Sequence, residues 1–458
     1  MTTHPATRRA ALSLSLLLLI GVAACGDRSQ EAHFALVGGT LIDGTGGPPL
    51  VNATVVVRGR YIEAIGSSAE VVLEDGITRV DAAGKWILPG LIDAHAHIQR
   101  WMLARYLAAG VTTVRDLHGE QDSILTLAEQ ANLNAFPSPQ LFVAGAMIDG
   151  APPTRTDATG VRDDTEGRQA VDQRSLAGVD QIMTYTRIAP ATLRAIVDEA
   201  RSFNLPVAAQ LGLTDALTAA RQGVRSIEQL SGVAEAATAN ASGLYAAHRQ
   251  GYWQGWTAAE QSWVRLRPLA LKDVAERLAE TGVILVPMLT THDTYSRLDD
   301  PSVVESASYL STPDSIRARW DPAALTAAAG WSLDFFRTAR LARGSQNRFL
   351  RDFAAAGGII AAGSNGGEDF FPPGDGLHTE IQLLAAAGLS PSEAIVAATG
   401  NGARLVGADS IGTLAPGKVA NLVILARDPL SDVRNTRSVE RIILRGAIMP
   451  TDSIRASW

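Results

Sequence analysis

The sequence is poor in cysteine, in charged residues and in net charge, and each shortage excludes a class of protein. One cysteine among 458 residues excludes an intrachain disulfide within this sequence and any metal site built from several cysteines. A formal net charge of −7 gives no sign of the basic surface that nucleic-acid binding requires. Charged residues make up 19% and hydrophobic residues 46%, which excludes intrinsic disorder and predicts a large buried core.

Residues 1–24 are predicted to be a secretory signal peptide. Arg8 and Arg9 form a positively charged start, and the apolar run Ala10–Ile20 follows. This run is too short for a comfortable membrane span, which needs about 20 apolar residues.

Cys25 directly follows the small residues of Val22-Ala23-Ala24. This pattern resembles the lipobox of bacterial lipoproteins, in which the cysteine becomes the lipidated N-terminus. We therefore expect Cys25 to be a lipid attachment site and residues 25–32 to be a tether. The protein is then secreted and lipid-anchored in a bacterial cell envelope, at the periplasmic or surface face of the outer membrane, and meets the membrane through its anchor only. The alternative is an ordinary signal peptide with a free cysteine.

Most of the remaining chain alternates short apolar segments with Ala- and Leu-rich segments of helical pattern. Such alternation predicts parallel strands joined by helices. With the strand before His95 the count reaches eight, which predicts an α/β (β/α)₈ TIM-type barrel. The other seven strands are expected at Val111–Val114, Leu141–Ala144, Gln181–Tyr185, Val207–Ala209, Arg225–Glu228, Val283–Pro287 and Gly358–Ala362. A helix is expected over Pro190–Phe203, with proline in its first turn.

Three long motifs resemble those of the amidohydrolase superfamily, most closely the branch of imidazolonepropionases and Xaa-Pro dipeptidases. They occur in the family's order, and they are Gly84–His97, Gly110–Asp116 and Ala397–Lys418. The resemblance implies that the terminal strands, including Asn421–Ala426 and Val439–Leu444, combine into a small β-sandwich. The barrel is expected at 88–404, and the β-sandwich is expected to form from an N-terminal segment at 33–87 and a C-terminal segment at 405–450.

The resemblance also implies one or two divalent metal ions, which activate water and polarise the scissile carbonyl. The family's His-x-His motif is present as His95 and His97, and residues two apart in a strand share one face. The other four ligand positions are replaced: the strand-4 lysine by Met183, the strand-5 and strand-6 histidines by Gln210 and Gln229, and the strand-8 aspartate by Asn365. Methionine cannot form a carbamate, and glutamine and asparagine are poor substitutes for imidazole and carboxylate. We expect the residual pair His95 and His97 to bind zinc or another divalent metal weakly at most, and no other cofactor.

Other residues could supply acid/base chemistry near this pocket. The candidates are Asp116 and His118 after the second barrel strand, His378 after the last one, and Glu228. A cluster of His95, His97 and His118 is also conceivable as a metal site, whereas the simpler interpretation places His118 in the pocket wall.

The segment 251–263 is rich in aromatic residues and follows the sixth barrel strand. Thr257 and Glu260 form the pattern of a capping box, which predicts a helix that begins at Ala258. The segment is expected either to pack on the barrel, which we favour, or to form a lid or wall for an apolar ligand.

Two classes of function follow. The family resemblance implies an envelope hydrolase acting on C–N bonds other than linear peptide bonds. The lost ligands favour a pseudoenzyme that binds a small molecule or a partner, as in the dihydropyrimidinase-like proteins of the nervous system, or a metal-independent lyase or isomerase. The sequence indicates neither the ligand nor the oligomeric state.

Overall fold

The structure is a computed structural model and describes residues 33–449 and Ile454. The predicted signal peptide, Cys25 and the tether lie outside these residues. No helix among the described residues is both long and apolar enough to span a membrane.

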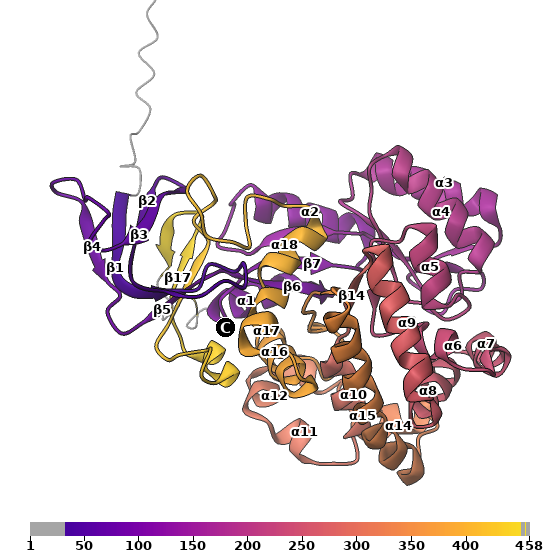
Figure 1. The fold of residues 1–458 in the computed structure, drawn as a ribbon. Helices are drawn as coiled ribbons and strands as arrows, with labels where there is room; N and C mark the ends of the chain where they lie inside the picture. The colour runs from indigo at the N-terminus through magenta and orange to yellow at the C-terminus, as the bar shows by residue number, and fades with distance from the viewer. Residues whose placement is uncertain (1–32, 450–453, 455–458) are drawn as a thin grey trace, which may run out of the picture. The chain divides into compact units, whose positions relative to one another are not determined.

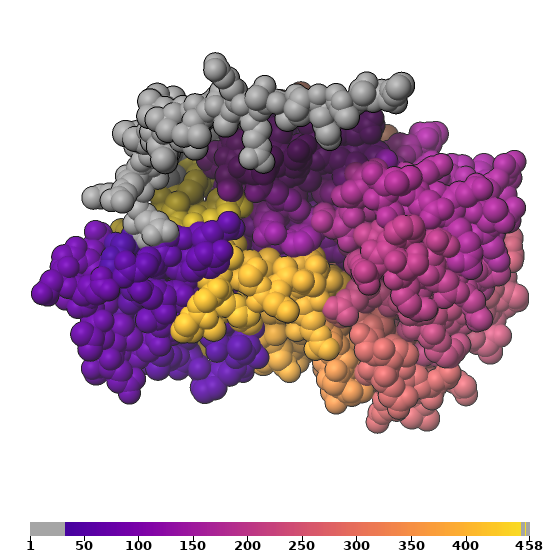
Figure 2. All heavy atoms as spheres, turned by 90° about the horizontal axis from the view of Figure 1, so that it is seen from above, coloured from indigo at the N-terminus to yellow at the C-terminus, as the bar shows by residue number. Residues whose placement is uncertain are grey.

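Strands from both ends of the described chain join in one eight-stranded sheet (Figure 1). Its order is β18-β17-β16-β5-β1-β2-β3, and β4 also pairs with β1. Figure 2 shows yellow C-terminal residues against indigo N-terminal residues on one face. The terminal segments therefore share a sheet, as the family resemblance implies. The strands are β1 (His33–Leu41), β2 (Leu50–Arg58), β3 (Tyr61–Ser67), β4 (Thr78–Asp81), β5 (Trp86–Pro89), β16 (Leu422–Leu425), β17 (Val439–Leu444) and β18 (Ala447–Met449).

The remaining strands are parallel and lie in two further sheets. Most are buried along their whole length, as expected of parallel strands covered by helices. One sheet has the order β6 (Leu91–Ala96), β7 (Val111–Asp116) and β8 (Gln140–Val143). The other has the order β10 (Thr159–Val161), β9 (Ile148–Gly150), β11 (Ile182–Thr184), β12 (Val207–Ala209), β13 (Ser226–Glu228), β14 (Ile284–Val286) and β15 (Ile359–Ile360).

Hydrogen bonds link these two sheets at both ends. The Asp180 N–H donates to the Val143 carbonyl at 2.9 Å, which joins the end of β8 to the approach to β11. The Ala94 N–H donates to the Ala362 carbonyl at 2.9 Å, which joins β6 to the segment after β15. The arrangement is an α/β fold consistent with a TIM-barrel-like domain.

Helices follow most of the parallel strands. Figure 1 shows α3, α4, α5 and α9 side by side, and consecutive members of this series are in contact. The α-helices are α1 (Leu103–Ala108), α2 (Gln121–Asn132), α3 (Asp164–Ala177), α4 (Pro190–Ser202), α5 (Ala216–Gln222), α6 (Val233–Ala237), α7 (Ala241–Gln250), α8 (Tyr252–Ser262), α9 (Pro268–Thr281), α10 (Leu289–Ser296), α11 (Ser302–Glu305), α12 (Ala307–Ser311), α13 (Asp314–Arg317), α14 (Pro322–Ala329), α15 (Leu333–Ala355), α16 (Asp375–Ala387), α17 (Pro391–Ala397) and α18 (Gly400–Val406). Short 3₁₀ turns are η1 (Arg100–Met102), η2 (Trp263–Arg265) and η3 (Val433–Arg437).

All the strands predicted for the barrel region are found within about two residues of their expected bounds, and the helix expected over Pro190–Phe203 is α4. The predicted start of the helix in the aromatic segment is wrong, because α8 begins at Tyr252. The two side chains of the supposed capping box are engaged elsewhere. The Thr257 hydroxyl accepts from the Trp331 indole, and the Glu260 carboxylate binds His292 and Gln346.

Candidate functional site

All six positions that correspond to the family's metal ligands line one cavity of about 490 Å³. They come from the C-terminal ends of the parallel strands: His95 and His97 from the end of β6, Met183 from β11, Gln210 and Gln229 after β12 and β13, and Asn365 after β15. This edge of parallel strands is where TIM-barrel enzymes place their active sites.

A buried ionic network fixes the ring of His95. Its Nδ1 lies 2.8 Å from Oε2 of Glu228, and Oε1 of the same carboxylate lies 3.0 Å from the Arg115 guanidinium. Burial opposes ionisation of Glu228, but Arg115 and His95 outweigh it and lower the carboxyl pKa. A carboxylate only accepts hydrogen bonds, so Nδ1 of His95 donates to Glu228.

His97 is oriented in the same way by a backbone carbonyl. Its Nδ1 donates to the His118 carbonyl at 3.2 Å, so its lone pair lies on Nε2. That Nε2 lies 3.9 Å from Oε1 of Glu368. Burial lowers the pKa of His97 to about 4, and the nearby Glu368 charge only partly offsets it. His97 is therefore a neutral imidazole at pH 7.

The replaced positions have a hydrogen-bond arrangement of their own. The Gln210 side-chain amide donates to Oε1 of Gln229 at 2.9 Å. Met183 packs in an apolar cluster with Leu117 and Tyr185. Oδ1 of Asn365 is buried without a hydrogen-bond partner. The cavity wall thus holds amides and a thioether where the family resemblance implies imidazoles, a carboxylate and a carbamate.

A chain of charges crosses the mouth of the cavity. Arg155 donates to Glu368 at 3.0 Å and pairs with Asp157 at 3.2 Å. Asp157 in turn lies 3.1 Å from Nε2 of His118. Burial favours a neutral Glu368, but the Arg155 guanidinium beside it lowers its pKa, so this carboxylate is ionised.

Asp149 in β9 positions both arginines of the cavity. Its carboxylate accepts from the backbone N–H groups of Thr154 and Arg187, each at 2.7 Å. These bonds fix the loop that carries Arg155 and the loop that carries Arg187, and both arginines line the cavity.

Aromatic side chains form the remaining wall. Tyr185 stacks on Tyr252 with ring centroids 5.8 Å apart, and Tyr252 contacts Trp253 edge to face. Tyr252 and Trp253 line the cavity, whereas Trp256 and Trp263 are buried in the core. The aromatic segment 251–263 therefore does both things that the sequence left open: it packs on the barrel and it walls the cavity.

The structure does not bring the acid/base candidates Asp116 and His378 into this cavity. Asp116 is fully buried, accepts from the Ile98 N–H at 2.6 Å, and burial raises its pKa well above the usual value. His378 lies on α16 with its Nε2 2.9 Å from the Ala109 carbonyl and its Nδ1 3.0 Å from the Thr436 hydroxyl. Both ring nitrogens are thus engaged in hydrogen bonds that hold α16 in the fold.

His118 lies just outside the cavity. Its Nδ1 accepts from the Met147 N–H at 3.1 Å, which leaves the ring proton on Nε2, 3.1 Å from the Asp157 carboxylate. The ring centroids of His97 and His118 are 6.4 Å apart. Within the described residues, no three His, Cys, Asp or Glu side chains are grouped so that they could hold a metal ion.

Sequence reasoning missed Arg155, Arg187 and Glu368. Glu368 follows the Gly363–Gly367 loop just after the last barrel strand, and this position is a signal that could have indicated it. Arg155 and Arg187 lie in loops whose sequence has no periodic pattern, so nothing in the sequence placed them near the histidines.

Comparison with known proteins agrees with this geometry. The family model described as the amidohydrolase family matches residues 86–449. Two curated relatives from Alcaligenes xylosoxydans xylosoxydans match only short stretches. A D-aminoacylase is 41% identical over 91 residues and an N-acyl-D-aspartate deacylase 38% identical over 93 residues, in each case 19% of this chain and 18% of the relative. The chain thus spans less than a fifth of either relative.

Solved structures show the same fold over nearly the whole chain. Bottromycin amidohydrolase superposes with a TM-score of 0.73 at 22% identity, covering 94% of this chain and 90% of that one. A Xaa-Pro dipeptidase with bound methionine superposes with a TM-score of 0.65 at 18% identity, covering 91% and 99%. The chain therefore belongs to the amidohydrolase family, whose members are hydrolase-like proteins that act on amide bonds.

Proposed function

We propose that this chain binds a small amide-containing molecule in the His95/His97 cavity and does so without the family's binuclear metal centre. The observation that supports this most directly is the direct hydrogen bond between Gln210 and Gln229, two side chains at positions of metal-binding histidines. The two amides hydrogen-bond to each other, and neither position offers an imidazole to a cation.

The donor set does not fit two metal ions. Only His95 and His97 keep the family's ligand type, whereas structural zinc has four protein ligands and catalytic zinc three. Met183 supplies no bridging carbamate, and Asn365 supplies no carboxylate to act as a base. A single weakly held divalent ion on the two histidines is the most that these side chains support.

The cavity presents hydrogen-bond acceptors at its floor and charged side chains near its opening. His97 keeps a lone pair on Nε2, and the ionised Glu368 lies 3.9 Å from that atom. Such a floor suits a ligand with N–H donors. Arg155 and Arg187 can donate hydrogen bonds to an anionic or carbonyl group near the opening, while Tyr185 and Tyr252 cover apolar parts of the ligand.

A second candidate is metal-independent acid/base chemistry on the same ligand. Its support is the neutral His97 beside the ionised Glu368, since a neutral imidazole next to a carboxylate can accept a proton. This chemistry would use His97 as the base and Glu368 to stabilise the imidazolium.

The proposal includes the finer features of the fold and location. The hydrogen bonds at both sheet junctions support closure of the parallel strands into one (β/α)₈ barrel, and the shared terminal sheet supports a β-sandwich beside it. Attachment through a lipid on Cys25, in a bacterial cell envelope, is proposed from the lipobox-like sequence alone.

The test is metal analysis of two proteins purified in excess zinc and manganese. Wild type should hold far less than one tightly bound metal per chain. A variant with the family's ligands restored should take up metal, because the cavity keeps its shape. Its four substitutions are Met183→Lys, Gln210→His, Gln229→His and Asn365→Asp.

The control carries the same four changes together with His95→Asn and His97→Asn, and it should lose the uptake. Two tightly held metals per wild-type chain would refute the proposal. Hydrolysis of N-acetylated amino acids by metal-free wild type, lost in both His97→Asn and Glu368→Gln, would instead establish the second candidate.

A further inference from the structure

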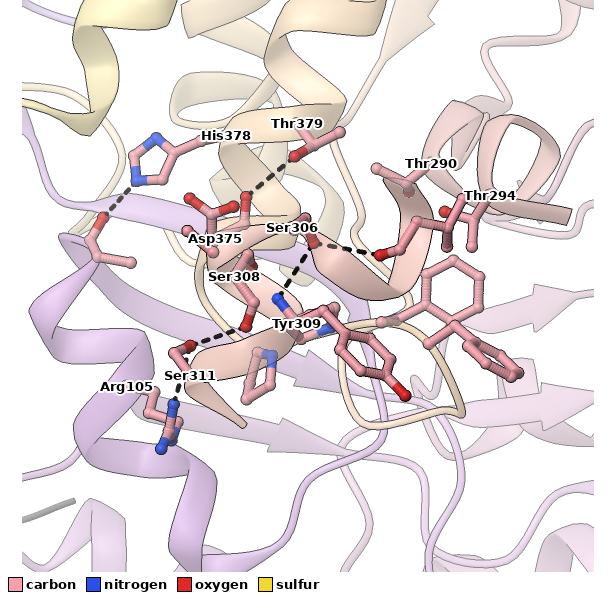
Figure 3. A pocket seen from close by; sticks show the side chains of 18 of the residues that line it. Arg105, Thr290, Thr294, Ser306, Ser308, Tyr309, Ser311, Asp375, His378 and Thr379 are labelled. Atoms are coloured by element: carbon pink, nitrogen blue, oxygen red, sulfur yellow. Dashed lines mark hydrogen bonds between the residues drawn. The ribbon is translucent and has the colours of Figure 1, made fainter. Parts of the chain in front are cut away.

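A second cavity, of about 620 Å³, lies apart from the His95/His97 site, and its polar side chains are already bonded within the fold (Figure 3). Both ring nitrogens of His378 have hydrogen-bond partners, and the Asp375 carboxylate accepts from Arg437 at 2.8 Å. No methionine is among the described residues that line it. It thus lacks the open nitrogen and sulfur donors that the cavity of the two barrel histidines has.

Two methionines lie side by side in the wall of the cavity that holds the two barrel histidines. Ile148 of β9 is in register with Thr184 of the neighbouring parallel strand β11. Met147 and Met183 each precede one of these residues, so their backbones are about 4.8 Å apart and their side chains project to the same face. Both line the cavity and belong to one apolar cluster. Since the chain has only six methionines, two thioethers beside two imidazoles are a concentration of soft donors.

The two histidines of this cavity are held as metal-binding histidines usually are. A ligating imidazole commonly donates its other ring N–H to a carboxylate or a backbone carbonyl. Nδ1 of His95 lies 2.8 Å from the Glu228 carboxylate, and Nδ1 of His97 lies 3.2 Å from the His118 carbonyl. Nε2 is therefore the nitrogen that each ring has left for a ligand in the cavity.

The separation of the two rings fits one shared ion. Their centroids lie 5.3 Å apart and their planes are inclined by 73°. Two imidazoles that bind one ion through Nε2 at about 2 Å have centroids roughly 6.4 Å apart if the arrangement is linear, and roughly 5.2–5.5 Å apart if it is tetrahedral or trigonal. The observed value indicates a bent arrangement, which leaves a coordination position for a further ligand. The thioethers of the same cavity are neutral donors that can take this position.

Imidazoles and thioethers together favour a soft ion of low charge. Thioethers select ions such as copper(I), whereas magnesium, calcium and manganese prefer oxygen ligands. All four donors are neutral when they bind, so a monovalent ion leaves a single positive charge to be balanced. The ionised Glu368 lies 3.9 Å from Nε2 of His97 and is close enough to balance it.

We propose that this cavity binds one copper(I) ion through the imidazoles of His95 and His97 and the thioether pair of Met147 and Met183. The inference rests on one part of the proposed function, the lack of the family's binuclear centre, and does not depend on the amide ligand. The ion is taken up and held as copper(I), so no electron is transferred. Any proton on either Nε2 is released to water as the ion binds.

The experiment is anaerobic titration of the full chain with copper(I) against the chromogenic competitor bicinchoninate, with zinc titrated in parallel. Wild type should withdraw one copper(I) ion per chain from the competitor and should bind zinc more weakly. X-ray absorption at the copper edge should show both nitrogen and sulfur neighbours.

Variants without the sulfur atoms separate coordination from packing. Exchange of methionine for leucine in a core keeps the volume and costs little stability, so the double variant Met147→Leu and Met183→Leu should still fold. It should bind copper(I) roughly tenfold or more weakly and show no sulfur neighbour. Met102→Leu is the matched control, since Met102 is equally buried but does not line the cavity, and it should bind as wild type does.

The copper site is overturned if wild type leaves the ion with the competitor, if the double variant binds as tightly as Met102→Leu, or if the bound ion has no sulfur neighbour. A failure of these kinds leaves the proposed function intact. Two tightly held zinc or manganese ions per wild-type chain would overturn both, since the binuclear centre would then be present.

Discussion

The buried carboxyl group of Glu380 offers a sharp test of the electrostatics of the protein interior. It lies on α16 and accepts from the backbone N–H groups of Leu289 and Thr290 at 3.0 and 2.8 Å, so it caps the start of α10. Burial raises its pKa from 4.5 to about 7, although these two hydrogen bonds act in the opposite direction. Glu380→Gln keeps the shape of the side chain and removes the titration.

The sign and size of the effect follow from proton linkage. The folded state holds the Glu380 proton more tightly than the unfolded state, so this contribution to stability is complete below about pH 4.5. It is lost as the pH rises through about 7. Since one pKa unit corresponds to about 1.4 kcal/mol, the wild type should lose roughly 2–3 kcal/mol between pH 5 and pH 8 through this group. Other titrating groups are common to both proteins and cancel in the difference.

The assay is urea unfolding of wild type and Glu380→Gln, followed by tryptophan fluorescence at pH 5, 6, 7 and 8. Between pH 5 and pH 8 the free energy of unfolding of the variant should rise, relative to that of wild type, by roughly 2–3 kcal/mol. Glu276→Gln, on the exposed face of α9, is the control for loss of a carboxylate at an exposed position. A constant difference for Glu380→Gln, or one that falls as the pH rises, would refute the reasoning.

Two further predictions concern the eight-stranded sheet of the terminal segments and the charged opening of the His95/His97 cavity. Gly446→Ala should cost at least about 2 kcal/mol more than Gly417→Ala in thermal unfolding. Both glycines have φ near +80°, but a Cβ on Gly446 would lie 1.8 Å from the Gly59 carbonyl oxygen, whereas one on Gly417 meets nothing within 4 Å. Arg155→Met should raise the pKa of His97, as followed by NMR of its ring protons, because it removes a cation that helps burial to hold that pKa near 4. An unchanged His97 titration would contradict the charge network at the cavity mouth.

The parallel strands could be predicted because they are short apolar runs between helical segments. The parallel strand Val207–Ala209 was expected at the bounds that the structure shows, and so was the antiparallel strand Val439–Leu444 of the terminal sheet. The strands β9 and β10 were not expected, since each has three residues and they lie in a segment rich in Gly and Pro without alternation. The predicted start of α8 was wrong, because Thr257 and Glu260 match a capping pattern but make tertiary contacts instead.

The positions of the site could be predicted where they follow a strand in a recognisable motif. His95 and His97 and the four replaced positions were all named from sequence, and the structure places all six in one cavity. Arg155 and Glu368 come from loops 213 residues apart in sequence. Their meeting depends on the closure of the fold around the cavity, which no local pattern encodes.

The surroundings of Met183 explain why restoring a single family ligand should fail. Met183 is 2% exposed and packs with Leu117, Met147 and Tyr185, so a lysine at this position would bury an ammonium group among apolar side chains. An unpaired buried charge costs several kcal/mol. The cost is offset only if metal ions are held nearby, and that requires imidazoles at 210 and 229 as well. The four substitutions therefore act as a set: the complete variant should fold and bind metal, whereas Met183→Lys alone should lower the unfolding temperature without any gain in metal binding.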